Sequence, residues 1–240
     1  MTSFFSALSY PFRGVAYFLR RPALWKYAAA AFAINLALFA LLAVLFFKYR
    51  ADLVAWVTPA RFPAWLRSAL GWILSGVAIA AGLFLFTIVG NLLATPFLDA
   101  MTEHILRELG ETLPPGRGPG RALLRALVNQ SLKLALFGGV QALLLLLLVT
   151  PLGFLHPPLS AFLAVLFLGF EYADYPLDAR RLSVPDRVGW LLDHLGAALG
   201  FGSVIFALLW IPFLGYVFLP LAVAGASLLA HDLDPPSSRM

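Results

Sequence analysis

The sequence predicts an all-α integral membrane protein. Hydrophobic residues make up 61% of the 240 residues, and charged residues make up only 12%. A soluble domain carries about 25% charged residues, because water must wet its surface. The apolar residues also occur in long blocks, and the mean hydropathy is +0.88. The sequence contains no cysteine, which excludes disulfides and thiolate metal sites.

Two blocks are long enough to cross a membrane. Residues 24–47 are mostly Ala, Leu, Phe and Val, with Lys26 near the start, and as a helix they reach about 36 Å. Residues 70–98 contain no Lys, Arg, Asp or Glu. A hydrocarbon core is about 30 Å thick, so both blocks are predicted to be transmembrane helices.

The N-terminal residues 1–21 carry an apolar face that is interrupted at Pro11. They lack the positive start and the small-residue cleavage site of a signal peptide. We expect an interfacial amphipathic segment lying on the membrane, with a poorly ordered N-terminus as the alternative.

Two later blocks resemble hairpins. Residues 134–170 contain no Lys, Arg, Asp or Glu, but prolines and a glycine within 151–158 divide them into arms of about 26 and 18 Å. Residues 196–230 repeat this plan around 212–220, with arms of about 24 and 22 Å. Because most of these arms are shorter than a span, we predict two partially inserted, re-entrant helical hairpins.

Charge placement predicts the topology of what we interpret as a single membrane domain, residues 1–240. Residues 99–133, a helix and a Pro/Gly-rich linker, are expected on the same side as both termini. That side then carries 13 of the 17 Lys and Arg residues, so the positive-inside rule makes it cytoplasmic. Four complete spans would give the same sidedness. The opposite side holds Lys48, Arg50, Arg61 and Arg67.

The sequence favours no enzyme, no cofactor and no bound metal. It lacks a phosphate-binding GxxxxGK[ST] loop, an HExxH pair and a GxSxG elbow, and its four histidines are far apart. A lipid enzyme would require clustered polar groups. The net charge of +5 is attributed to membrane topology, so no nucleic acid partner is expected. The expected partner is the lipid bilayer.

The stretch "LRRPALWKY" is a candidate anion site. Pro22 suits the first turn of a helix, where its missing N–H costs nothing. Arg20 and Arg21 directly precede that turn, and Lys26 follows about one turn later. Unpaired N–H groups, the positive helix end and two guanidinium groups together favour an anion. The alternative is that these charges only set topology and meet lipid phosphates.

Polar and small residues interrupt the apolar blocks. Asn35 and Asn91 lie within the two predicted spans, where they form either interhelical hydrogen bonds or polar contacts along a transport pathway. Gly196 and Gly200, like Gly71 and Ser75, have the four-residue spacing of small side chains that lets helices approach closely.

The stretch "EYADYPLDARR" is the most distinctive motif. We expect the helix to stop near Tyr175, because Pro176 disfavours helical geometry in the residue before it. Asp178 is expected to face the arginines that follow it. The motif is either a headgroup anchor or a gate or interhelical lock, and its residues are Glu171, Asp174, Tyr175, Pro176 and Asp178.

Several segments together resemble a known family. "EYADYPLD" and "IPFLGYVFLPLAVAGASLLAHD" are similar to the signature of the CysZ family of bacterial inner-membrane sulfate permeases, relatives of the etoposide-induced-protein group. "ATPFLDAMTEHI" resembles that family's Pro-Phe stretch, here Pro96, Phe97 and Glu103. "FLRRPALWKYAAAAFAIN" resembles its entry into the first long span, including Arg20 and Arg21.

The resemblance implies two long spans, two partially inserted hairpins and a homo-oligomer, a dimer or larger. It also implies passage of sulfate across the bacterial inner membrane for cysteine synthesis, with an anion site at Arg20 and Arg21. The expected function is therefore a permease for sulfate or a related oxyanion. The competing hypothesis is a non-transporting structural scaffold whose hairpins bind or shape lipid.

Overall fold

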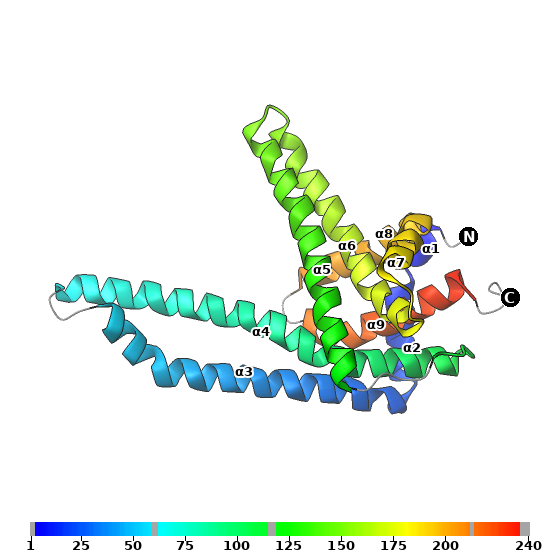
Figure 1. Cartoon of the computed structure of the whole chain (residues 1–240), viewed down its shortest axis with the longest axis horizontal. Helices are drawn as coiled ribbons and strands as arrows, with labels where there is room; N and C mark the ends of the chain where they lie inside the picture. The colour runs from blue at the N-terminus through cyan, green and yellow to red at the C-terminus, as the bar shows by residue number, and fades with distance from the viewer. Residues whose placement is uncertain (1–2, 59–61, 115–118, 212–213, 236–240) are drawn as a thin grey trace. The chain divides into compact units, whose positions relative to one another are not determined.

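The computed structural model describes residues 3–58, 62–114, 119–211 and 214–235, and no strand occurs among them. The prediction of an all-α protein is therefore confirmed (Figure 1). The elements are α1 Phe4–Ala7, α2 Tyr10–Leu19, α3 Pro22–Val57, α4 Ala64–Glu108, α5 Pro119–Leu145, the 3-10 turns η1 Leu146–Val149 and η2 Gly153–Leu155, α6 His156–Ala179, α7 Val184–Asp193, α8 Leu195–Leu209 and α9 Leu214–Leu233.

The chain forms two compact units. Unit 1 comprises Met1–Ala28 and Pro96–Met240, and unit 2 comprises Ala29–Thr95. Helices α3 and α4 each have one part in either unit, so unit 2 consists of the long C-terminal part of α3, the long N-terminal part of α4 and the residues that join them.

Four helical stretches of the described residues are long and apolar enough to cross a membrane: Pro22–Val57, Ala64–Glu108, Leu127–Val149 and Gly153–Ala179. The pair α7 and α8, bent by 90°, counts as a fifth if it forms one span. In the most apolar windows of the first and third stretches, only 6% and 0% of the residues are buried inside the chain. Their apolar side chains therefore face outward, where lipid or another protein must cover them.

The first hairpin differs from expectation in the length of its arms. Helices α5 and α6 continue past the uncharged run 134–170 at both of its ends. The 24 residues of α6 alone reach about 36 Å. The expected short arms counted only uncharged residues, but Lys133 and Glu171 stay helical because they pair with each other. The predicted division into two long spans and two partial hairpins is thus not confirmed.

Side chains from both arms join α5 to α6. The rings of Phe137 and Phe167 stack with their centroids 4.3 Å apart. Nearer the tip, the Ser160 hydroxyl donates to the Gln141 amide oxygen over 3.1 Å. The Ser160 hydroxyl also lies 3.3 Å from His156 Nε2 in its own helix. The hydrogen bond to Gln141 favours one register of the two helices, because an unsatisfied side-chain amide is costly in lipid.

Within unit 1, glycines allow helix backbones to touch. A Cβ atom on Gly14 of α2 would lie 2.6 Å from the Cα of Gly225 in α9, and a Cβ on Gly225 would lie 2.6 Å from the Tyr10 carbonyl oxygen. Gly202 of α8 meets Gly169 of α6 in the same way, with 2.9 Å from its Cβ position to the Gly169 nitrogen. Such close packing replaces the hydrophobic driving force that helices lack inside a bilayer.

We expect Gly225→Ala to destabilise unit 1, because the added methyl group meets backbone atoms that cannot rotate away. The expected cost is about 1–3 kcal/mol, seen as a lower midpoint of thermal unfolding in detergent. Gly189→Ala in α7 is the control, since a Cβ there meets nothing within 4 Å. Equal midpoints for the two variants would contradict the close crossing of α2 and α9.

Candidate functional site

The turn between α2 and α3 presents the predicted basic pair. Arg20 caps the end of α2, and its backbone N–H donates to the Ala16 carbonyl. Pro22 opens α3, as expected of a residue without an N–H. The indole of Trp25 donates back to the Phe18 carbonyl over 3.2 Å, which ties the first turn of α3 to the end of α2. The basic pair therefore sits at the N-terminal, positive end of a 36-residue helix.

Arg21 is held in place by residues that the sequence reading did not single out. Its Nε lies 2.9 Å from Glu108 Oε2, and its guanidinium stacks 3.6 Å from the centre of the Tyr17 ring. The Tyr17 hydroxyl donates to the same Glu108 oxygen over 2.9 Å. Burial, followed by the hydrogen bond to Glu108, raises the pKa of Tyr17 to about 12, so Tyr17 remains a donor at neutral pH.

His104 completes the surroundings of Glu108. Its Nε2 lies 3.4 Å from Glu108 Oε1, one helical turn away, and its ring lies 6.0 Å from that of Tyr27. The Glu108 carboxylate thus pairs with Arg21, accepts from Tyr17 and lies beside the His104 ring. Since 91 residues separate Tyr17 from Glu108, no local spacing in the sequence points to this cluster.

The other two predicted anion ligands remain exposed. Arg20 forms no ion pair with any described residue, and Lys26 places its ammonium 4.9 Å from the centre of the Tyr27 ring. The three cations therefore differ in their surroundings: Arg21 is neutralised by Glu108, whereas Arg20 and Lys26 have no carboxylate partner in the described part of the chain. A net positive charge remains at the start of α3.

The two asparagines lie in unit 2 in different environments. The Asn35 amide donates to Ala31 of its own helix over 3.1 Å, and its oxygen fills the space where a Cβ on Gly90 would be. Asn91 is exposed. The hydrogen bond of Asn35 is thus within its helix, and its contact with α4 is one of packing.

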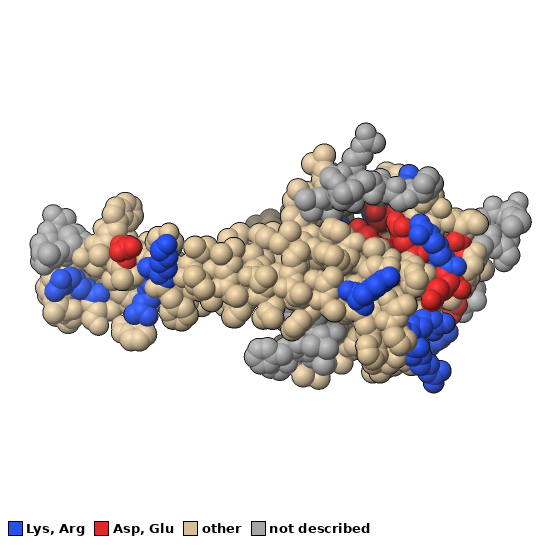
Figure 2. All heavy atoms as spheres, turned by 90° about the horizontal axis from the view of Figure 1, so that it is seen from below, with Lys and Arg blue, Asp and Glu red and all other residues tan. Residues whose placement is uncertain are grey.

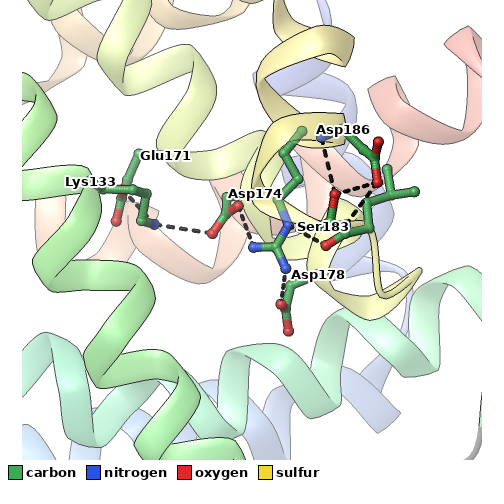
Figure 3. A network of polar contacts seen from close by, with 8 residues as sticks. Lys133, Glu171, Asp174, Asp178, Ser183 and Asp186 are labelled. Carbon is green, nitrogen blue, oxygen red and sulfur yellow. Dashed lines mark hydrogen bonds and ion pairs between the residues drawn. The ribbon is translucent and has the colours of Figure 1, made fainter.

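The "EYAD" motif forms the centre of a network of ion pairs (Figure 3). Lys133 of α5 places Nζ 2.8 Å from Glu171 Oε2 and 3.2 Å from Asp174 Oδ2. The other oxygen of Asp174 lies 2.8 Å from Nη1 of Arg187 in α7, and Arg187 also pairs with Asp178. Asp174 and Arg187 are only 8% and 1% exposed, so the centre of this network is buried.

The end of α6 contradicts the expectation of a stop near Tyr175. The helix continues through Pro176 to Ala179, and the Arg180 N–H donates to the Pro176 carbonyl over 3.2 Å. Pro176 removes one backbone hydrogen bond from the last turns of α6 but does not end the helix. The two acids on either side of it stay helical because Arg187 binds both. The partner of Asp178 beyond its own helix is therefore Arg187.

A second buried group of charges lies beside this network. Arg180 contacts Glu111 with Nε at 3.0 Å and Nη2 at 2.6 Å, and it also donates to the Ala230 carbonyl. His231 Nδ1 lies 2.9 Å from Glu111. These contacts join the segment after α4 to the ends of α6 and α9.

The fold and its charged helix ends define a multi-pass α-helical membrane protein. Residues 10–220 match the family model described as "Sulfate transporter CysZ/Etoposide-induced protein 2.4". The chain belongs to this family, as the resemblance in its motifs indicates.

Three relatives illustrate the similarity, and each is named "Sulfate transporter CysZ". The protein of Pseudomonas aeruginosa is 30% identical over 223 residues, 88% of either chain. That of Pseudomonas fluorescens is 31% identical over 150 residues, 60% of either chain. That of Pectobacterium atrosepticum is 31% identical over 178 residues, 71% of this chain and 65% of the relative. Their names describe transporters, which agrees with the prediction that the chain is not an enzyme.

We expect Asp174→Ala to lower stability by about 1.5–3 kcal/mol, because it removes the charged acceptor that Lys133 and Arg187 share and leaves them only Glu171 and Asp178. Asp186→Ala is the control. It removes an exposed carboxylate that accepts from Ser183 in the capping box of α7, at a cost of about 1 kcal/mol. Thermal unfolding in detergent measures both. A loss for Asp174→Ala no larger than that for Asp186→Ala would show that the network is not stabilising.

Proposed function

We propose that this protein is a permease that passes sulfate or a related oxyanion into the bacterial cytoplasm, where sulfate supplies cysteine synthesis. Membership of the family and the names of its relatives support the substrate. The apolar helices support a path through a membrane. The scaffold alternative has no comparable support.

The observation that carries the proposal is the state of Arg21. Its guanidinium is oriented by the Tyr17 ring and by Glu108, yet its side chain is still 40% exposed. An anion that reaches the turn meets Arg20 and the positive helix end first. It then competes with Glu108 for the guanidinium of Arg21, which binds tetrahedral oxyanions through paired N–H donors.

Glu108 therefore acts as an internal counter-ion in the proposed mechanism. Without it, Arg21 would hold an anion strongly and release it slowly. With it, the anion exchanges against a carboxylate that is also negative, so part of the free energy gained on capture is offset by the ion pair that is lost. Conduction requires binding that is strong enough for entry and weak enough for departure.

The architecture that we propose around this site follows the family. Residues 24–47 and 70–98 cross the inner membrane, the segments 134–170 and 196–230 enter it partially, and both termini are cytoplasmic. The apolar arms of α5 and α6, which the chain itself leaves uncovered, support a homo-oligomer in which copies pack together. In this arrangement Asn35 and Asn91 supply polar contacts along the route.

Replacing both Arg20 and Arg21 by alanine is expected to reduce sulfate uptake into proteoliposomes by at least about tenfold, because the capturing charges are lost. Radiolabelled sulfate measures the uptake. The matched control is Arg13→Ala with Arg107→Ala, which also removes two exposed cations from unit 1, each from an ion pair. Unchanged uptake in the Arg20, Arg21 variant would overturn the proposal, and an absence of saturable sulfate binding to the unaltered protein would favour the scaffold.

Glu108→Gln is expected to tighten sulfate binding by about two- to fivefold, because it removes the competing charge and retains an acceptor for Tyr17. Isothermal titration of the purified protein with sodium sulfate measures the affinity. Glu103→Gln is the control, since Glu103 pairs with Arg107 one turn away on the same helix. Weaker binding in Glu108→Gln would mean that Glu108 orients Arg21 and does not compete with the anion.

A further inference from the structure

A groove lies within unit 2, between the last turns of α3 and the first turns of α4. Its volume is about 720 Å³. Figure 2 shows Lys and Arg side chains gathered at this end of the α3–α4 hairpin. The groove is lined by Arg50, Ala51, Val54, Ala55, Thr58, Ala64, Arg67, Ser68, Gly71, Trp72 and Ser75.

Small residues create the space. Ala51 and Ala55 of α3 and Ala64, Ser68 and Gly71 of α4 leave room that larger side chains would fill. The two helices meet at Gly71, where a Cβ atom would lie 3.4 Å from Val54 Cγ1, in ordinary contact. The contact between Gly71 and Val54 therefore bounds the groove on one side, and the small residues leave the space next to it unfilled.

The groove holds two arginines and no acid. Arg50 comes from α3 and Arg67 from α4, and no carboxylate of the described residues pairs with either guanidinium. Asp52 is the only acid between Lys48 and Ser75, and it does not line the groove. Two like charges facing one cavity repel each other, so an anion between them lowers the energy of both.

The hydroxyl groups limit where the ligand is held. Thr58 donates to the Val54 carbonyl over 2.6 Å and Ser75 to the Gly71 carbonyl over 2.7 Å, so their hydrogens are already used. The donors that remain in the lining are the two guanidinium groups, the Ser68 hydroxyl and the Trp72 indole N–H. Planar guanidinium groups bind the oxygens of phosphate and sulfate through paired hydrogen bonds.

Exposed tryptophans indicate the level of the groove in the membrane. Trp56, Trp65 and Trp72 are 85%, 71% and 76% exposed. Tryptophan concentrates at the headgroup level, so the groove faces the interface between lipid and water. Both a lipid phosphate and an ion from solution can reach such a position.

We propose that the groove binds a tetrahedral oxyanion between Arg50 and Arg67, as a site separate from Arg20 and Arg21. The phosphate of an anionic lipid headgroup and free sulfate share the required chemistry. The apolar lining from Ala51, Val54 and Trp72 adds a surface for the glycerol and upper acyl carbons of a lipid. The proposal does not depend on sulfate transport.

The test uses the full chain carrying Arg20→Ala and Arg21→Ala, so that the other candidate site contributes nothing. One arm titrates sodium sulfate into the protein in neutral detergent without lipid. The second arm adds phosphatidylglycerol to the micelles and measures retained lipid by native mass spectrometry, with phosphatidylcholine as the neutral comparison. Binding in the first arm identifies free sulfate as a ligand, and selective retention in the second identifies the lipid phosphate.

Arg50→Ala and Arg67→Ala are each expected to weaken the observed binding by at least about tenfold. Lys48→Ala is the matched control: it removes one cation of the same end of the hairpin, which lies over the Tyr49 ring and does not line the groove. Replacing both arginines by lysine keeps the charge and loses the paired donors, so intermediate binding is expected. This lysine variant also keeps the proposal testable if an alanine variant does not fold. Absence of binding in both arms, equal binding by the alanine variants, or an equal loss in Lys48→Ala would overturn the proposal.

Discussion

The carboxylate of Asp174 lies between two cations from other helices, Lys133 of α5 and Arg187 of α7. A buried charge without a partner costs several kcal/mol, so each cation is held by two carboxylates: Lys133 by Asp174 and Glu171, and Arg187 by Asp174 and Asp178. This constraint fixes the base of the α5–α6 hairpin and the direction in which the chain leaves it. The contacts of Arg180 with Glu111 and Ala230 apply the same rule to the ends of α6 and α9. Buried ion pairs thus hold the helices together where their apolar stretches end.

Exposure separates the structural cations from the functional candidate. The side chain of Arg187 is 2% exposed, whereas that of Arg21 is 40% exposed. Both have carboxylate partners, but only Arg21 can exchange its partner for a solute without opening the interior. In the proposed mechanism, Tyr17 keeps the Arg21 guanidinium oriented while its partner changes. The same type of ion pair therefore stabilises the fold at Arg187 and forms part of the proposed binding site at Arg21.

Small residues act in two opposite ways along the chain. In unit 1, glycines let backbones touch, as at Gly14 and Gly225. In unit 2, alanines and Gly71 leave a groove beside two arginines. Gly200, whose spacing from Gly196 predicted a close approach, does meet α1: a Cβ there would lie 3.1 Å from the Phe4 carbonyl carbon. Whether a small residue closes or opens an interface depends on what faces it, which spacing alone does not define.

The sequence by itself determined the membrane class, the helical fold and the basic pair at the start of α3, because these depend on composition, length and adjacent residues. It did not determine the ends of the hairpin helices or the continuation of α6 through Pro176. Charged residues at the ends of apolar runs and a proline near a helix end both favour an early end of the helix. Ion pairs with residues of other helices override this local preference. Only the tertiary structure decided the partners: Glu108 lies 91 residues from Tyr17, and Asp174 lies 41 residues from Lys133. Electrostatic pairing acts through space, so its pattern emerges only when the helices are packed.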